Sequence, residues 1–157
     1  MEFTDSSGNK YVLPKGTNVG VRISVYPVVL NNKNELLLYM PHYNKQWQLP
    51  GGGFDESVDK DIEDTAIREC LEETGYTIRL ISDDPIYMNQ QNFYKRGDQK
   101  YYFAEHIFLL AELVSEIPVG VSEEDKDGIV SWINLEELNE KNTHPIIHDV
   151  INILKKL

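Results

Sequence analysis

Short runs of apolar and β-branched residues, separated by turn signals, recur along most of the chain. Runs of this kind predict β-strands. We expect strands at residues 10–13, 19–30, 35–40, 47–49, 77–81, 86–94, 101–113 and 129–133. The Asn-Asn-Lys-Asn turn at 31–34 predicts that the strands on either side of it form a hairpin. Residues 95–98 read as a second turn and residues 115–128 as an acidic loop.

Helical spacing of apolar residues appears in two longer segments. The first helix is expected to begin between Ser57 and Asp61, where several side chains could cap it, and to end at Gly75. Its buried stripe is expected to comprise Ile62, Ala66, Ile67, Cys70 and Leu71. The second helix is expected at 145–157, preceded by one helical turn at 135–138. Its inner face is expected to comprise Ile146, Val150, Ile153 and Leu154.

Strands outnumber helices, so the helices are expected to cover a sheet. We predict a mixed α/β fold of the α+β type, with one helix on each face of a mixed sheet in a three-layer α/β/α arrangement. A length of 157 residues suits one core, and we predict a single domain over residues 1–157.

The charge balance narrows the classes of partner. A net charge of −11 argues against non-specific binding to nucleic acid or to an anionic membrane. It leaves a nucleotide substrate open, because bound cations can supply local positive charge. The longest apolar run, 107–113, is too short to cross a bilayer, and the first residues lack a signal-peptide core, so we expect a cytoplasmic protein. The lone Cys70 is expected to be a core residue.

Three carboxylates share one face of the first predicted helix. Glu69, Glu72 and Glu73 stand at i, i+3 and i+4, where like charges cost about 0.2–0.5 kcal/mol per pair. A hard divalent cation such as Mg²⁺ needs such oxygen ligands. The preceding turn contains Gly51 and two further glycines, which allow the backbone to approach a metal or phosphate closely. A solvated acidic helix face is the alternative interpretation.

Residues 51–76 resemble the signature of the Nudix hydrolase family, which includes MutT-like proteins. That signature reads Gly-x5-Glu-x7-Arg-Glu-U-x-Glu-Glu-x-Gly-U, where U is a bulky apolar residue. Its second half is matched by Arg68, Glu69, Cys70, Glu72, Glu73, Gly75 and Tyr76. The first half departs from the pattern, because Lys60 stands where the first glutamate belongs and Phe54 where the glycine belongs. The resemblance implies that this glutamate is supportive, and Glu56 is a candidate to replace it.

The resemblance implies a pyrophosphohydrolase that uses Mg²⁺, with Mn²⁺ as a substitute. It would cleave a pyrophosphate bond in a nucleoside diphosphate linked to another group: a nucleoside triphosphate, an oxidised nucleotide or a dinucleoside polyphosphate. Glu69 and Glu73 would be the principal metal ligands, with Glu72 and a backbone carbonyl of Gly51 or Gly52 completing the site. The catalytic residues would be Glu72, Glu73, Arg68 and Glu124.

In that set Arg68 would orient the carboxylates, and Glu124, in the acidic loop, would be the base or a further ligand. A solvated acidic loop is an equal alternative for Glu124.

Two residues are candidates for contact with the substrate. Tyr94 lies eighteen residues after the Tyr76 that ends the signature, a spacing that resembles members acting on dinucleoside polyphosphates. Arg96 lies in a compact basic group that could reach a distal phosphate, although a solvated hairpin tip is the simpler interpretation. Two hypotheses compete with hydrolysis: a nucleotide-binding or sensor module that has lost turnover, motivated by Lys60, and a purely structural acidic domain. The sequence leaves a homodimer open.

Overall fold

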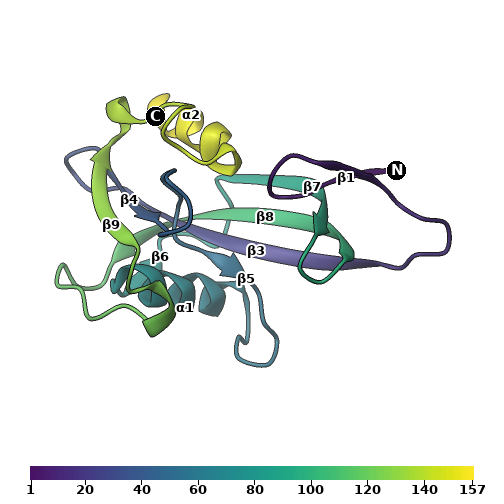
Figure 1. The fold of residues 1–157 in the computed structure, drawn as a ribbon. Coiled ribbons are helices and arrows are strands. Elements are labelled where there is room, and N and C mark those ends of the chain that lie inside the picture. Colours follow the sequence, from purple (N-terminus) through teal and green to yellow (C-terminus); the bar gives the residue numbers. More distant parts are fainter.

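A computed structural model describes residues 1–157, which form a mixed sheet with helices on both faces (Figure 1). The helices are α1 (Ile62–Thr74) and α2 (His148–Lys155), with short 3-10 turns η1 (Glu123–Asp125), η2 (Leu135–Glu137) and η3 (Pro145–Ile147). The strands are β1 (Glu2–Thr4), β2 (Lys10–Val12), β3 (Val19–Val29), β4 (Glu35–Met40), β5 (Gly52–Gly53), β6 (Ile78–Leu80), β7 (Tyr87–Lys95), β8 (Lys100–Leu113) and β9 (Ile129–Asn134).

Two long parallel strands form the centre of the larger sheet. β3 and β8 pair from Val19 opposite Tyr101 to Val29 opposite Ala111. The strand order is β2-β1-β7-β8-β3-β5, and β6 also pairs with β8. β7 runs antiparallel to β8, which makes the sheet mixed as predicted. Strand β1 was not predicted; it pairs with β2 and with β7.

The predicted hairpin of residues 19–30 and 35–40 is wrong. A single bridge, Leu30 with Leu36, joins the two strands, and β4 pairs instead with β9 in a separate two-stranded sheet. The turn itself forms, since the Asn31 N–H donates to the Glu35 carbonyl at 2.9 Å. Leu36, Leu37 and Leu38 are all fully buried, so β4 is covered on both faces, whereas a hairpin with one solvent-facing side would expose alternate leucines.

The two helices bury opposite faces of the sheet, which confirms the three-layer arrangement (Figure 1). On the α1 face, Val25, Ile107 and Leu109 pack with Ala66. On the α2 face lies a larger core; its fully buried members include Val28, Leu38, Phe108, Leu138, Ile147 and Val150. Neither helix is long and apolar enough to span a lipid bilayer.

Local signals place the ends of α1 well. Asp61 caps its N-terminus by accepting from the Asp64 N–H at 2.9 Å. Gly75 caps its C-terminus with φ of +79°, and its N–H donates to the Leu71 carbonyl. The predicted strand at 47–49 is reduced to isolated bridges. The predicted C-terminal helix begins as a 3-10 turn, and Ile151 rather than Ile153 is buried on its inner face.

Candidate active site

The glycine turn before α1 lies directly against the carboxylate face of the helix. The Gly51 N–H donates to Glu73 Oε1 at 2.7 Å. A Cβ on Gly52 would lie 2.6 Å from Glu69 Cδ, and a Cβ on Gly51 would collide with the Val25 carbonyl. No larger residue fits at either position without a shift of the backbone or of Glu69. The turn and the helix are therefore held together at the point where the sequence predicts a metal site.

Arg68 links the helix carboxylates to the segment before the helix. Its Nε and Nη2 donate to the two carboxylate oxygens of Asp59, both at 2.8 Å. Its Nη1 donates to Glu69 Oε1 at 3.0 Å and to Glu72 Oε2 at 3.4 Å. Its Nη2 also reaches the Gly53 carbonyl at 3.3 Å. One guanidinium thus restrains two of the three predicted metal ligands, as expected of a residue that orients them.

Asp59, rather than Glu56, is the carboxylate of the preceding segment that pairs with Arg68. The Asp59 side chain is 1 % exposed and also accepts from Thr65 Oγ1 at 2.9 Å and from the Asp55 N–H at 3.1 Å. The hydrogen bonds from Arg68 hold the pKa of Asp59 well below its usual range. Glu56 is exposed and contributes nothing to this cluster, so its proposed substitution is wrong. Asp59 lies nine residues before Arg68, one position beyond the expected spacing, and Lys60 points into solvent.

Burial makes two of the helix carboxylates hard to ionise in the metal-free protein. Burial raises the pKa of Glu73 to about 9, against the hydrogen bond from Gly51 and with help from the charges of Glu69 and Asp125. Burial also raises the pKa of Glu69, and the charge of Arg68 opposes that rise. Glu72 is more open, with 42 % of its side chain exposed. A cation placed among these oxygens would reverse the cost of ionising them.

The residues have the oxygen donors that a hard divalent cation needs, but their side chains do not converge on one point. No three or more His, Cys, Asp or Glu side chains converge as a metal-binding cluster, because Glu73 turns to Gly51 while Glu69 and Glu72 turn to Arg68. The available donors are all carboxylate or carbonyl oxygens, the ligand type of Mg²⁺. Gly52 lies directly against these donors, since a Cβ there would be only 2.6 Å from Glu69 Oε1.

The acidic loop 115–128 contacts the C-terminal half of α1 and presents Asp125 rather than Glu124. The Ser122 N–H donates to the Glu72 carbonyl at 2.8 Å. Asp125 Oδ1 accepts from the Tyr39 hydroxyl at 3.0 Å, and its Oδ2 accepts from the Ser122 hydroxyl at 2.6 Å. Glu124 is exposed and makes no such contact. Sequence reasoning missed Asp125 because Tyr39, its partner, is 86 positions away.

A long polar cleft lies on the sheet face opposite α1. Its volume is about 990 Å³, within the range of small-molecule sites. Its floor and walls are largely uncharged polar side chains; among them are Ser24, Gln46, Asn89, Gln91, His106 and His144. Tyr26 lies in the cleft and also touches Gly51, where its ring would collide with an added Cβ. The cleft therefore adjoins the glycine turn that holds Glu73.

The two predicted substrate residues lie outside the lining of this cleft. Tyr94 packs between Tyr11 and Tyr101, with ring centroids 4.1 and 4.7 Å away. Arg96 is 60 % exposed and reaches Asp5 at 3.5 Å, so it approaches the cleft only through Asp5.

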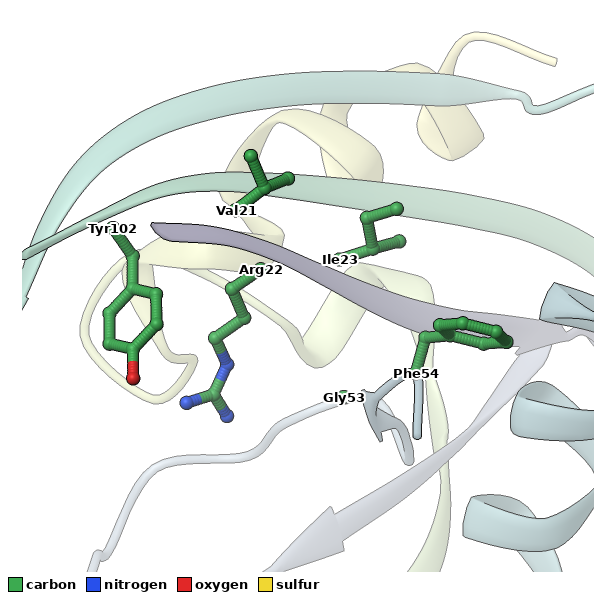
Figure 2. Close-up of a pocket in the computed structure, with 6 residues that line it drawn as sticks. All are labelled: Val21, Arg22, Ile23, Gly53, Phe54 and Tyr102. Carbon is green, nitrogen blue, oxygen red and sulfur yellow. The ribbon is translucent and has the colours of Figure 1, made fainter. Parts of the chain in front are cut away.

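Arg22, which sequence reasoning did not single out, lines both the cleft and a smaller hollow of about 310 Å³ beside β5. Figure 2 shows the Arg22 and Tyr102 side chains on the same side of β3, with the guanidinium directed toward the Gly53 backbone.

Comparison with known proteins is consistent with this geometry. The chain matches the NUDIX domain over residues 20–152. A putative 8-oxo-dGTP diphosphatase of Bacillus subtilis (strain 168) is 37 % identical over 62 residues, which cover 40 % of this chain and 40 % of that relative.

Solved structures share the fold along most of the chain. A MutT protein from Methanosarcina mazei Go1 aligns with a TM-score of 0.60 and 25 % identity, over 90 % of this chain and 97 % of its own. An ADP-ribose pyrophosphatase from Streptococcus suis 89-1591 aligns with a TM-score of 0.58 and 17 % identity, over 86 % of this chain and 90 % of its own. Because the domain match extends over most of its length, this chain belongs to the NUDIX domain family.

Proposed function

We propose that the protein is a Mg²⁺-dependent pyrophosphohydrolase that cleaves a nucleoside diphosphate linked to another group. The observation that carries the proposal is the Arg68 cluster, which restrains Glu69 and Glu72 next to a glycine turn that binds Glu73. This cluster adjoins a cleft large enough for a nucleotide. Relatives described as a diphosphatase and a pyrophosphatase support the same class of reaction.

The chain's own residues would divide the work as follows. Glu69 and Glu73, with Glu72 and a carbonyl of Gly51, would hold the cation. When bound, the cation would neutralise phosphate oxygens and lower the pKa of a water molecule. Arg68 would keep Glu69 and Glu72 in position, because its guanidinium is itself held by Asp59.

A loop carboxylate would take the proton of the attacking water. Glu124 is the residue expected from the sequence. Asp125 is the better candidate for the general base, because Tyr39 and Ser122 hold its carboxylate in a defined position. A base must stand within about 3 Å of the water or act through one further water molecule. Glu72, which is partly exposed, is the alternative acceptor on the helix.

The candidate substrates are nucleoside triphosphates, oxidised nucleotides, dinucleoside polyphosphates and nucleoside diphosphate sugars such as ADP-ribose. The test is a hydrolysis panel with Mg²⁺ or Mn²⁺ in which the products are identified, so that the cleaved bond is known. We expect release of phosphate, pyrophosphate or a nucleoside monophosphate from at least one class. Absence of any turnover across the panel would refute the proposal.

Glu73→Gln provides the critical variant and Glu63→Gln its control. The first removes a proposed ligand while keeping the side-chain shape, so the rate should fall by more than the roughly 10–100-fold that changes around metal ligands cost. Glu63 lies on the same helix but is exposed and away from the cluster, so its variant should keep full activity. Equal activity of the two variants would contradict the metal assignment. The sensor hypothesis rested on Lys60, and the neighbouring Asp59 supplies a carboxylate that pairs with Arg68.

A further inference from the structure

Two neighbouring side chains on the floor of the cleft form a hydrogen-bonded pair with spare binding capacity. Asn89 on β7 and His106 on β8 stand directly opposite each other in the antiparallel ladder. His106 Nδ1 and Asn89 Oδ1 are 2.7 Å apart. His106 is 7 % exposed, and both residues line the cleft. The pair is therefore fixed by the sheet and faces the space where a ligand would lie.

His106 is neutral at physiological pH. Burial lowers its pKa to about 4, and the charges of Arg22 and His144 lower it further in the same direction. A neutral imidazole has one N–H donor and one acceptor nitrogen. Its Nδ1 contacts Asn89, whereas its Nε2 makes no hydrogen bond to the protein. Every fully buried polar side-chain atom has a partner, so Nε2 is open to the cleft.

One amide N–H of Asn89 faces the Tyr87 hydroxyl, so the pair offers the other amide N–H and one His106 nitrogen side by side. If Nδ1 carries the proton, Nε2 accepts and the Asn89 amide nitrogen donates; in the other tautomer, with the amide reversed, the roles exchange. A phosphate group has only acceptors at neutral pH and matches half of this pair. The edge of a nucleobase has a donor next to an acceptor and matches both halves.

Arg22 supplies a positive charge in the same cleft as Asn89 and His106. It is the one arginine of the chain without a carboxylate partner, since Arg68, Arg79 and Arg96 are all in ion pairs. Arg22 is paired with Ala104 on β8, two residues before His106, so the backbones of Arg22 and His106 are about 8 Å apart. Its Nη2 would lie 3.9 Å from a Cβ on Gly53, whose carbonyl accepts from Arg68. Arg22 thus lines the cleft and also lies beside Gly53, so its free guanidinium suits a phosphate oxygen.

Resting on the proposed function, we propose that Asn89 and His106 bind the hydrogen-bonding edge of the substrate's nucleobase while Arg22 binds one of its phosphate oxygens. The pair and Arg22 determine which part of the nucleotide lies where. They take no part in proton transfer from the reacting water. Substitution at Asn89 should therefore raise KM and leave kcat nearly unchanged.

The test measures binding without turnover. Calorimetry in the absence of divalent cations compares the four common nucleoside monophosphates with ribose 5-phosphate, which lacks the base. We expect at least one monophosphate to bind more tightly than ribose 5-phosphate. Asn89→Leu should lower the affinity for that monophosphate about three- to tenfold, which corresponds to the loss of one neutral hydrogen bond. The affinity for ribose 5-phosphate should be unchanged. Arg22→Gln should lower the affinity for both ligands about ten- to a hundredfold.

Two further variants make the result interpretable. Asn89→Asp keeps an oxygen for His106 and so preserves the pair, but it removes the amide donor and should cause a similar loss for the monophosphate. Asn92→Leu lies on β7 with its side chain on the opposite face and serves as the control; it should bind both ligands like the unmodified protein. A monophosphate that binds no better than ribose 5-phosphate, or that binds Asn89→Leu at full strength, would overturn the proposal.

These outcomes are separate from those of the hydrolysis panel. Turnover with base-independent binding would refute the role of Asn89 and His106 and leave the proposed hydrolase intact. Base-dependent binding without turnover of any nucleotide would refute the hydrolase and leave the binding pair intact.

Discussion

Asp59→Asn is the most informative single substitution in the candidate site. The aspartate side chain is 1 % exposed and receives two hydrogen bonds from Arg68 at 2.8 Å, together with those of Thr65 and Asp55. Asparagine keeps the shape but removes the charge and turns an amide N–H₂ toward one of the guanidinium donors. Breaking a buried ion pair by changing one partner costs about 3–5 kcal/mol. Arg68 is 27 % exposed and regains some hydration, so we expect the lower end, about 3 kcal/mol.

Urea unfolding followed by circular dichroism measures that loss, and a thermal melt should show a drop of about 6–12 °C. Glu56→Gln is the matched control, because it makes the same chemical change in the same segment at an exposed side chain. Its effect should stay within about 0.5 kcal/mol. Equal stabilities of the two variants would refute the reasoning. Mg²⁺-dependent activity of Asp59→Asn should also fall roughly 10–100-fold, since Arg68 would no longer be held against Glu69.

The pH dependence checks the same contact independently. The pKa of Asp59 in the folded protein lies below its ordinary value because Arg68 favours the ionised form. A carboxyl group of this kind contributes stability above its unfolded pKa of about 3.9, and the contribution is lost as pH falls through the lower folded pKa. The stability difference between the unmodified protein and Asp59→Asn should therefore be constant from pH 7 to 5 and shrink only below about pH 4. A difference that disappears near pH 6 would contradict the ion pair.

Two further predictions concern the loop 115–128 and its contact with the end of α1. Asp125→Asn should reduce the hydrolysis rate at saturating substrate about 100-fold or more, which is the range expected when a general base is lost. Glu124→Gln should retain most activity, because Glu124 is exposed. If Glu124→Gln loses more activity than Asp125→Asn, Glu124 is the base. Gly75→Ala should destabilise the fold by at least about 1–2 kcal/mol, because φ is +79° and the new Cβ would collide with the Val119 carbonyl. Gly120→Ala, which meets no atom within 4 Å, is its control in urea unfolding and should be near neutral.

The sequence was most informative where the physical signal is local. The helical spacing between Ile62 and Gly75 predicted α1 with nearly correct ends, because the capping groups lie within a few residues of the backbone they satisfy. The same local register placed Glu69, Glu72 and Glu73 on one helix face. The structure links Glu69 and Glu72 through Arg68, whereas Glu73 accepts from the Gly51 N–H. Most strand positions followed from apolar and β-branched runs and turn residues, but β1 was missed and residues 47–49 form only isolated bridges.

Partners distant in sequence were the main source of error. The turn after β3 was identified correctly, but whether β4 pairs with β3 or with β9 depends on how completely its leucines are buried. Asp125 could not be separated from Glu124, because the hydroxyl that holds it belongs to Tyr39 on another strand. The cleft is likewise assembled from β3, β7, β8 and the segment before α2, and no single stretch of sequence has its pattern.

The substitution of Lys60 for the first signature glutamate illustrates both what local sequence determines and what depends on the folded chain. Sequence spacing established that the glutamate was missing and that the Arg68 half of the signature was intact. Which side chain replaces it depends on the path of the loop over residues 55–61, which brings a buried Asp59 against Arg68 and leaves Glu56 in solvent. Hydrogen bonds to neighbouring backbone are encoded within a few residues, whereas an ion pair between a loop and a helix needs the folded chain to bring its two charges together.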